Sequence, residues 1–368
     1  MRYDKVFRFL LFAFIIGSAL GLVGGLVLGG ERHASAHSTK APAGKGKATT
    51  STTAADKAPE PMTAERARAI GANELGMVLV LEYHKITKPE DQNAPEPDYC
   101  RSALHFKQDI ELLKSEGYYP ITVKELATGN IAIPAGKSPV VLTFDDSSPG
   151  QYRVLEDGSI DPECAVGILQ AAAKDGTWPM KASFFVLLDV TPPDNILFGQ
   201  PDLQQEKMRN LVKWGCEVGS HTYTHLNFQK STSDVIRKEL ALSKQKIEQL
   251  VGGDYQVYTL CVPYGAYPED VSILRNGEHE GVSYAYKAAL EVAGGPSYSP
   301  FSTKFDPMRI LRIEVQHDAL KRAVDNLKKN PDLRYISDGD PAVVSVPAST
   351  SEKLGNLADK LGRPVITY

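Results

Sequence analysis

The sequence predicts a parallel (β/α) barrel from two observations. Short apolar, strand-like runs alternate with helix-like amphipathic segments between residues 77 and 315, which is the pattern of repeated βα units. Residues with reactive side chains follow directly after several of these runs, and the carboxyl ends of the strands in a parallel barrel meet at one mouth. A doubly wound open sheet is the alternative, because it is built from the same units.

One strand is central to this prediction. Residues 140–146 read VVLTFDD, an apolar run that ends in Asp145 and Asp146. Two carboxylates beside apolar residues are costly to bury unless a cation pairs with them. A second short strand, EVGSHTYTH, ends with His221 and His225. One Asp and two His make a three-ligand metal set with positions left open for water, which is typical of a hydrolytic site.

The other elements are expected in order along the chain. Apolar residues three and four apart indicate the helices, and the strands are short apolar or β-branched runs. The expected strands are residues 77–86, 140–146, 181–187, 216–220, 255–263, 284–291 and 310–315, and the expected helices are residues 106–116, 162–174, 205–214 and 235–251.

The first thirty residues predict a membrane segment. Residues 1–8 carry Arg2, Lys5 and Arg8, and the 22 residues 9–30 contain no charge. A helix of this length spans a bilayer at about 1.5 Å per residue. We expect an uncleaved anchor with its amino end in the cytoplasm, and a signal peptide cleaved after an Ala-Ser-Ala sequence is the alternative.

Glycine recurs in this segment at every fourth position. Such a stripe favours close approach of two transmembrane helices and hence a homodimer, although glycine is also common in membrane helices generally. The stripe consists of Gly17, Gly21, Gly25 and Gly29.

Composition divides the rest of the chain. Residues 31–76 lack aromatic residues and are rich in Ala, Thr, Lys, Pro and Ser, so we expect a disordered tether in which residues 63–75 could form a short helix. Residues 77–330 are expected to form the barrel, and residues 331–368 an extension packed on it.

Charge and cysteine content exclude some classes of protein. A net charge of −4 and an isoelectric point near 6.1 give no basic surface for nucleic acid. The four cysteines contain no CxxC pair, so neither a zinc ribbon nor a dense disulfide framework is indicated. We expect most of them to be buried thiols.

Three motifs resemble those of a known family. TFDD at residues 143–146, HTYTH at 221–225 and PYG at 263–265 resemble successive motifs of the polysaccharide deacetylases, the NodB-homology carbohydrate esterases of family four. LEYHKI, followed by FKQDIELLKSEGYYPITVKEL, is similar to the branch that deacetylates poly-N-acetylglucosamine. The resemblance implies a distorted (β/α)7 barrel and hydrolysis of N-acetyl groups on sugar polymers.

The resemblance also implies roles for the matched residues. Asp146, His221 and His225 would bind one divalent ion, for which Zn²⁺ is favoured and Co²⁺, Ni²⁺ or Fe²⁺ are alternatives. Asp145 would be the general base that takes a proton from water. Adjacent strand residues point to opposite faces, which allows the two Asp side chains different roles.

Two further roles follow from the same resemblance. The backbone N–H of Tyr264 would hold the oxyanion. His84 would be the general acid that protonates the leaving amine. His317, in VQHD, is the alternative acid because it loosely resembles a late motif of the family, and for His84 the alternative is a core histidine near the barrel mouth.

Two positions depart from the family pattern. Cys261 stands where the third motif usually has an arginine that orients the base, and Ser147 stands where a glycine usually follows TFDD. Loss of a guanidinium beside Asp145 would raise the pKa of that carboxyl unless another cation replaced it. Arg309 and Arg312 are the candidates for this replacement.

The sequence as a whole predicts a membrane-tethered, metal-dependent deacetylase of an N-acetylhexosamine polymer outside the cytoplasmic membrane. Secretion after cleavage is the alternative location. The alternative function is a non-catalytic glycan-binding domain that keeps the barrel but has lost turnover through the change at Cys261.

Overall fold

The computed structural model describes residues 61–88, 97–191 and 195–368. Residues 59–368 form one compact unit. The expected anchor, its glycine stripe and most of the expected tether lie outside the described residues. Among the helices of the described part, none is long and apolar enough to cross a membrane.

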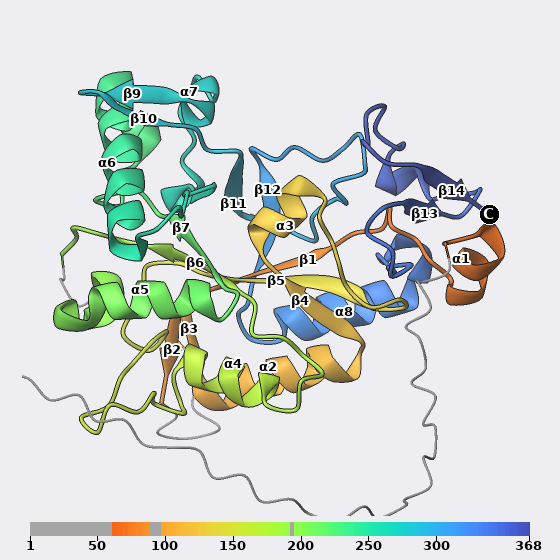
Figure 1. Ribbon diagram of the computed structural model, residues 1–368, viewed down its shortest axis with the longest axis horizontal. Helices are drawn as coiled ribbons and strands as arrows, with labels where there is room; N and C mark the ends of the chain where they lie inside the picture. Colours follow the sequence, from red (N-terminus) through yellow and green to blue (C-terminus); the bar gives the residue numbers. More distant parts are fainter. Residues whose placement is uncertain (1–60, 89–96, 192–194) are drawn as a thin grey trace, which may run out of the picture. The chain divides into compact units, whose positions relative to one another are not determined.

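Within that part of the chain, seven parallel strands form a closed ring (Figure 1). Its order is β1 (Leu79–Tyr83), β12 (Ile310–Glu314), β11 (Ala288–Gly294), β8 (Thr259–Cys261), β7 (Glu217–Ser220), β6 (Ser183–Val186) and β5 (Ser138–Phe144). The ring closes because β1 pairs with both β12 and β5. An eighth strand, β4 (Tyr118–Ile121), pairs with the first half of β5. This confirms the predicted (β/α)7 barrel and rules out the open sheet.

Helices of the described residues follow the strands at the four places where the sequence predicts them and at three others. They are α2 (Ala103–Ser115), α3 (Val123–Thr128), α4 (Ala165–Ala173), α5 (Gln204–Lys213), α6 (Ser233–Val251), α7 (Ser272–Arg275) and α8 (Ala319–Lys329). Polar side chains fix where several of them begin. The Ser102 hydroxyl accepts from the His105 N–H at 3.2 Å at the start of α2, and Thr122 and Glu125 form a capping box at α3.

Among the described residues, three small strand pairs and several 3₁₀ turns lie outside the ring. The pairs are β2 (Lys85–Thr87) with β3 (Cys100–Ser102), β9 (Gly277–His279) with β10 (Val282–Tyr284), and β13 (Val344–Val346) with β14 (Val365–Thr367). The turns are η2 (Leu197–Gly199), η3 (Pro201–Leu203), η4 (Phe228–Lys230), η5 (Pro263–Gly265), η6 (Pro331–Leu333) and η7 (Glu352–Leu354). The strand expected at residues 284–291 is divided between β10 and β11.

The core explains why β5 reads as a continuous apolar run. All seven of its residues are buried. The side chains of a parallel barrel strand face either the interior of the barrel or the helices around it, so neither face is exposed to solvent. The rings of Tyr83, Phe144 and Phe184 stack across β1, β5 and β6 with centroid separations of 5.5 and 4.8 Å. This stack fixes the ends of the strands from which the reactive residues project.

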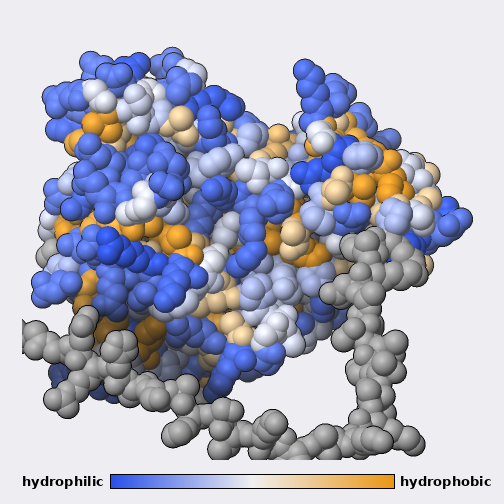
Figure 2. All heavy atoms as spheres, viewed as in Figure 1, coloured by the Kyte–Doolittle hydropathy of each residue, from blue (hydrophilic) through white to orange (hydrophobic). Residues whose placement is uncertain are grey.

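The folded chain begins before the expected boundary at Met77. Residues of the expected tether form α1 (Ala64–Ile70), and the buried Glu74 carboxylate accepts from the Ser345 N–H at 2.9 Å. The Met77 N–H donates to the Leu333 carbonyl at 2.7 Å. Residues 331–368 therefore pack against the start of the folded chain. On the face in Figure 2, hydrophobic residues gather near β13 and β14, where Val365 is exposed.

Candidate active site

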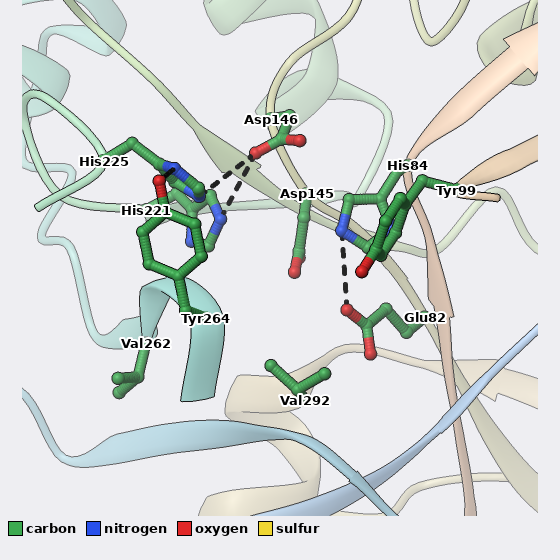
Figure 3. Close-up of a pocket in the computed structure, with 10 residues that line it drawn as sticks. All are labelled: Glu82, His84, Tyr99, Asp145, Asp146, His221, His225, Val262, Tyr264 and Val292. Carbon is green, nitrogen blue, oxygen red and sulfur yellow. Dashed lines mark hydrogen bonds and ion pairs between the residues drawn. The ribbon is translucent and has the colours of Figure 1, made fainter. Parts of the chain in front are cut away.

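Reactive side chains from four strands meet at one mouth of the barrel (Figure 3). His84 follows β1, Asp145 and Asp146 follow β5, and His221 follows β7. His225 and Tyr264 reach the same pocket from the loops after β7 and β8. All the strands in the ring are parallel, so every carboxyl end lies at this edge. The structure thus brings together the six residues that the sequence singles out.

Asp146, His221 and His225 form a compact cluster. One carboxylate oxygen of Asp146, Oδ1, lies 3.4 Å from Nε2 of His221 and 3.6 Å from Nε2 of His225. That oxygen is buried and has no hydrogen-bond partner among the described residues. A buried oxygen without a donor is costly unless a cation satisfies it. The donor set and the unsatisfied oxygen therefore fit a divalent ion.

The other ring nitrogens of both histidines have partners of their own. Nδ1 of His221 lies 2.9 Å from the carbonyl oxygen of Cys261, and Nδ1 of His225 lies 2.9 Å from the Tyr264 hydroxyl. A carbonyl acceptor places the proton of His221 on Nδ1, which leaves Nε2 free to bind a metal. A histidine that binds a metal usually has its second ring nitrogen hydrogen-bonded in this way.

Backbone strain is concentrated at the same place. Asp146 and His225 have φ values of 70° and 60°, in the left-handed region that residues other than glycine rarely adopt. Ser147 has φ 45°, a conformation to which glycine is better suited. The Ser147 hydroxyl offsets the strain by donating to the Asn195 carbonyl at 2.7 Å and accepting from the Leu187 N–H at 3.1 Å.

The electrostatics of the two histidines differ. Burial, together with the nearby His221, lowers the pKa of His225 to about 4, so its ring is neutral near pH 7 as a ligand requires. Burial opposes a charge on His221 as well, but Asp145 and Asp146 outweigh that effect and raise the pKa of His221. The two carboxylates thus favour a positive charge at this point of the pocket.

Arg312 supplies the guanidinium that the change at Cys261 removes. It lies in β12, is fully buried, and donates to both carboxylate oxygens of Asp145, with Nη1 to Oδ1 at 3.0 Å and Nη2 to Oδ2 at 2.9 Å. The Cys261 thiol donates to Oδ2 of Asp145 at 3.1 Å. Arg309, the other candidate, pairs with Glu291 at 2.6 Å instead. Of the two arginines, Arg312 is the replacement.

The arginine decides the protonation state of Asp145. Burial, the largest single effect, would raise the pKa of this carboxyl, but Arg312 together with His221 and His84 outweighs burial and holds the pKa well below its usual range. Asp145 is therefore ionised near pH 7.

Arg312 also links Asp145 to the opposite side of the pocket. Its Nη2 lies 3.1 Å from Oε1 of Glu82, and the same oxygen lies 3.5 Å from Nε2 of His84. Burial is the main reason that the pKa of Glu82 is raised well above its usual range and that the pKa of His84 is lowered. His84 thus sits beside a buried carboxyl group at the pocket wall.

Tyr264 and His317, the other two residues proposed from the sequence, lie in different environments. Tyr264 lines the pocket, is 63% exposed and has φ 60° within η5. Its N–H lies in the first turn of η5, where backbone donors have no acceptor within the helix. His317 is exposed, its carbonyl accepts from Arg101 Nη1 at 3.0 Å, and it is not among the described residues that line the pocket.

The pocket has a volume of about 340 Å³. Its wall also includes Glu82, Tyr99 and Val292, which the sequence does not single out. Glu82 could have been identified from the sequence, because it is a charged residue within the apolar run LVLEY. Arg312 is likewise a charged residue within ILRIE. Tyr99 and Val292 have no comparable feature.

A sequence profile for the family described as polysaccharide deacetylase matches residues 132–282. The matched segment contains Asp145, Asp146, His221, His225 and Tyr264. Residues 132–282 belong to a polysaccharide deacetylase domain. The family that this domain matches is one of hydrolases, the polysaccharide deacetylases.

Several proteins resemble this chain. YxkH of Bacillus subtilis, provisionally named a polysaccharide deacetylase, is 23% identical over 247 residues, which are 62% of this chain and 76% of YxkH. The crystal structure of BC0361, a polysaccharide deacetylase from Bacillus cereus, has a TM-score of 0.50 and 21% identity over 67% of this chain and 69% of that one. BA0330 of Bacillus anthracis, provisionally named in the same way, has a TM-score of 0.50 and 20% identity over 68% of each chain. At these identities the two structures establish the likeness of the fold.

Proposed function

We propose that the protein is a divalent-metal-dependent deacetylase that hydrolyses N-acetyl groups of an N-acetylhexosamine polymer outside the cytoplasmic membrane. One observation supports it above all others. A buried, unsatisfied oxygen of Asp146 faces the free ring nitrogens of His221 and His225, and the ionised Asp145 lies beside them in one pocket.

Asp146, His221 and His225 would hold the ion. Zn²⁺ suits one carboxylate and two imidazoles, and Co²⁺, Ni²⁺ and Fe²⁺ suit the same set. When bound, a divalent ion acidifies water and polarises the acetyl carbonyl. The Cys261 carbonyl and the Tyr264 hydroxyl keep the two rings oriented for this purpose.

Asp145 takes a proton from the water that attacks the acetyl carbon. The clamp by Arg312 keeps this carboxylate ionised and fixes its direction. The N–H of Tyr264 stabilises the negative charge that develops on the carbonyl oxygen, and a preorganised donor of this kind contributes roughly 2.7 to 4 kcal/mol.

His84, in its protonated form, gives a proton to the sugar nitrogen as the carbon–nitrogen bond breaks. The leaving amine is too basic to depart without that proton. In the pocket, His84 lies across from the metal-site histidines, with Glu82 beside its Nε2 (Figure 3). The products are acetate and a free amino sugar.

A panel of acetylated glycans tests the reaction. The full-length protein, purified in detergent, should release acetate from at least one N-acetylhexosamine polymer, and Asp145→Asn should release none above background. Release from O-acetylated polymers alone would contradict the proposed substrate class.

Elemental analysis tests the ligands. Wild type should contain about one divalent ion per chain, and a His221→Ala, His225→Ala double variant should lose it. Equal metal content in both proteins would show that the ligands are wrong.

The location is a separate proposal, supported by the charge-free residues 9–30 that follow three basic residues. We expect the chain to stay in the membrane fraction with its barrel accessible to protease from outside. A soluble protein that begins near His37 would show cleavage instead.

A further inference from the structure

Tyr99 lies at the pocket wall but has no part in the reaction described above. It is 54% exposed. Its φ is 62°, so the backbone is held in the left-handed region at some cost. Strain of this kind in a residue other than glycine is concentrated at functional sites, including the clamps that hold ligands.

The position of Tyr99 is fixed by its surroundings. Its carbonyl accepts from the Lys85 N–H at 2.9 Å, which places it beside His84 at the start of the β2–β3 pair. Two residues further on, buried Arg101 donates to both oxygens of Asp109 on α2, at 2.9 and 2.6 Å. The ring of Tyr99 meets the His84 ring at 5.0 Å and 69°. The exposed ring is therefore held in place by the fold.

A second exposed tyrosine stands on the other side of the pocket. The ring of Tyr264 is 4.4 Å from the ring of His225. Figure 3 shows Tyr99 and Tyr264 at opposite ends of the pocket, with Asp145 and Asp146 between them. The two carboxylates and the two exposed rings therefore line one pocket.

We propose that Tyr99 is a specificity-determining residue that stacks on the pyranose ring of the sugar whose N-acetyl group is removed. The inference rests on the proposed function. The C–H bonds of a pyranose face are positively polarised and match the negative face of an aromatic ring. Because His84 adjoins Tyr99, a sugar stacked there presents its nitrogen near the proton donor.

Kinetics on an N-acetylhexosamine polymer test the proposal. Tyr99→Ala and Tyr99→Leu in the full-length protein should raise KM for the polymer about 10-fold, a change equal to about 1.4 kcal/mol of binding. Tyr99→Phe, which keeps the ring, should stay within about two-fold of wild type. The loss should be several-fold larger for the polymer than for 4-nitrophenyl acetate, which has no pyranose. Leu155→Ala is the control, because Leu155 is exposed but lies away from the pocket.

The outcomes separate this inference from the proposed function. If wild type releases acetate and Tyr99→Ala and Tyr99→Leu keep its KM, the stacking role alone is overturned. Equal losses on the polymer and on 4-nitrophenyl acetate would likewise contradict a contact with the sugar. If folded wild type releases no acetate from any acetylated glycan, the proposed function fails and the role of Tyr99 fails with it.

Discussion

Arg312 is the residue on which the charges of the site depend. Its guanidinium contacts the carboxylates of Asp145 and Glu82, and Glu82 in turn approaches His84. These side chains are buried or nearly so, and removing one partner of a buried ion pair leaves an uncompensated charge. Arg312 thus joins the proposed base to the carboxyl group beside the proposed acid.

Replacing Arg312 should impair both stability and turnover. Arg312→Met is expected to lower the free energy of unfolding by about 3 to 5 kcal/mol and kcat by at least about 100-fold. A Cys261→Arg, Arg312→Met double variant returns a guanidinium to the position where the family usually carries it, and should recover part of kcat. Denaturant unfolding and acetate release measure the two effects. No recovery in a folded double variant would mean that the direction of approach to Asp145 is as important as the charge.

The proposed acid can be separated from its rival by mutation. His84→Ala should lower kcat by about 10²- to 10⁴-fold, the usual contribution of general acid catalysis, while metal content stays at the wild-type level. His317→Ala is the matched control and should keep wild-type kcat, because His317 is exposed and outside the described pocket wall. Activity of His84→Ala within a few-fold of wild type would exclude this role.

Residues that follow strands could be predicted from the sequence, and residues that meet only in three dimensions could not. Asp145, His221 and Tyr264 each come directly after or near a recognisable strand, and parallel strands bring such positions together. The pairing of Arg312 with Asp145 joins residues 167 positions apart and depends on the ring closing between β12, β1 and β5. Arg309 and Arg312 were both candidates from the sequence, and only Arg312 interrupts an apolar strand, ILRIE, which could have favoured it.

At the level of elements, helix α6 supports the loop that carries His225. Glu239 on α6 is buried, and its Oε2 accepts from the N–H groups of Tyr223 and Thr224 at 2.9 and 2.8 Å. Its other oxygen accepts from the Thr224 hydroxyl at 2.9 Å. A single carboxylate therefore holds the left-handed turn that aims His225 into the pocket.

Loss of this support should weaken metal binding. Glu239→Ala is expected to lower metal affinity by about 10- to 100-fold, which is usual when a group that orients a metal ligand without binding the metal is removed. Asp234→Ala, on an exposed part of the same helix, is the control and should not change it. Metal affinity is measured by competition with a chelator of known strength. Equal metal affinity in Glu239→Ala and wild type would show that the turn keeps its conformation without Glu239.

The elements themselves were predicted unequally well. Helix α6 was expected at residues 235–251 and found as Ser233–Val251, because its apolar positions repeat every three to four residues. The strand expected at residues 255–263 is reduced to β8, Thr259–Cys261, since Tyr255 donates its hydroxyl to the Val218 carbonyl at 2.7 Å from outside the sheet. The sequence does not show which aromatic residues at the end of an apolar run lie outside the hydrogen-bonded strand.

In the folded unit as a whole, the first and last segments meet around the carboxyl group of Glu74. Burial and the nearby Asp338 raise the pKa of Glu74 from 4.5 to about 8. The neutral form is thus favoured in the folded state, so this group stabilises the fold most below about pH 4.5, and that contribution is lost as pH rises to about 8.

Glu74→Gln should make stability less dependent on pH. Between pH 5 and 8 the free energy of unfolding of wild type should fall by up to about 1.4 kcal/mol per pH unit relative to that of Glu74→Gln. Denaturant unfolding of both proteins at several pH values measures the difference. Parallel pH profiles would show that Glu74 is ionised in the folded protein at neutral pH.

The most direct test of the proposed mechanism is acetate release from an N-acetylhexosamine polymer before chelation, after chelation and after return of Zn²⁺. Wild type should lose activity when its metal is removed and regain it when about one equivalent is returned. The His221→Ala, His225→Ala variant should stay inactive throughout. Undiminished acetate release from wild type whose metal content has fallen to background would contradict a metal-dependent reaction at Asp146, His221 and His225.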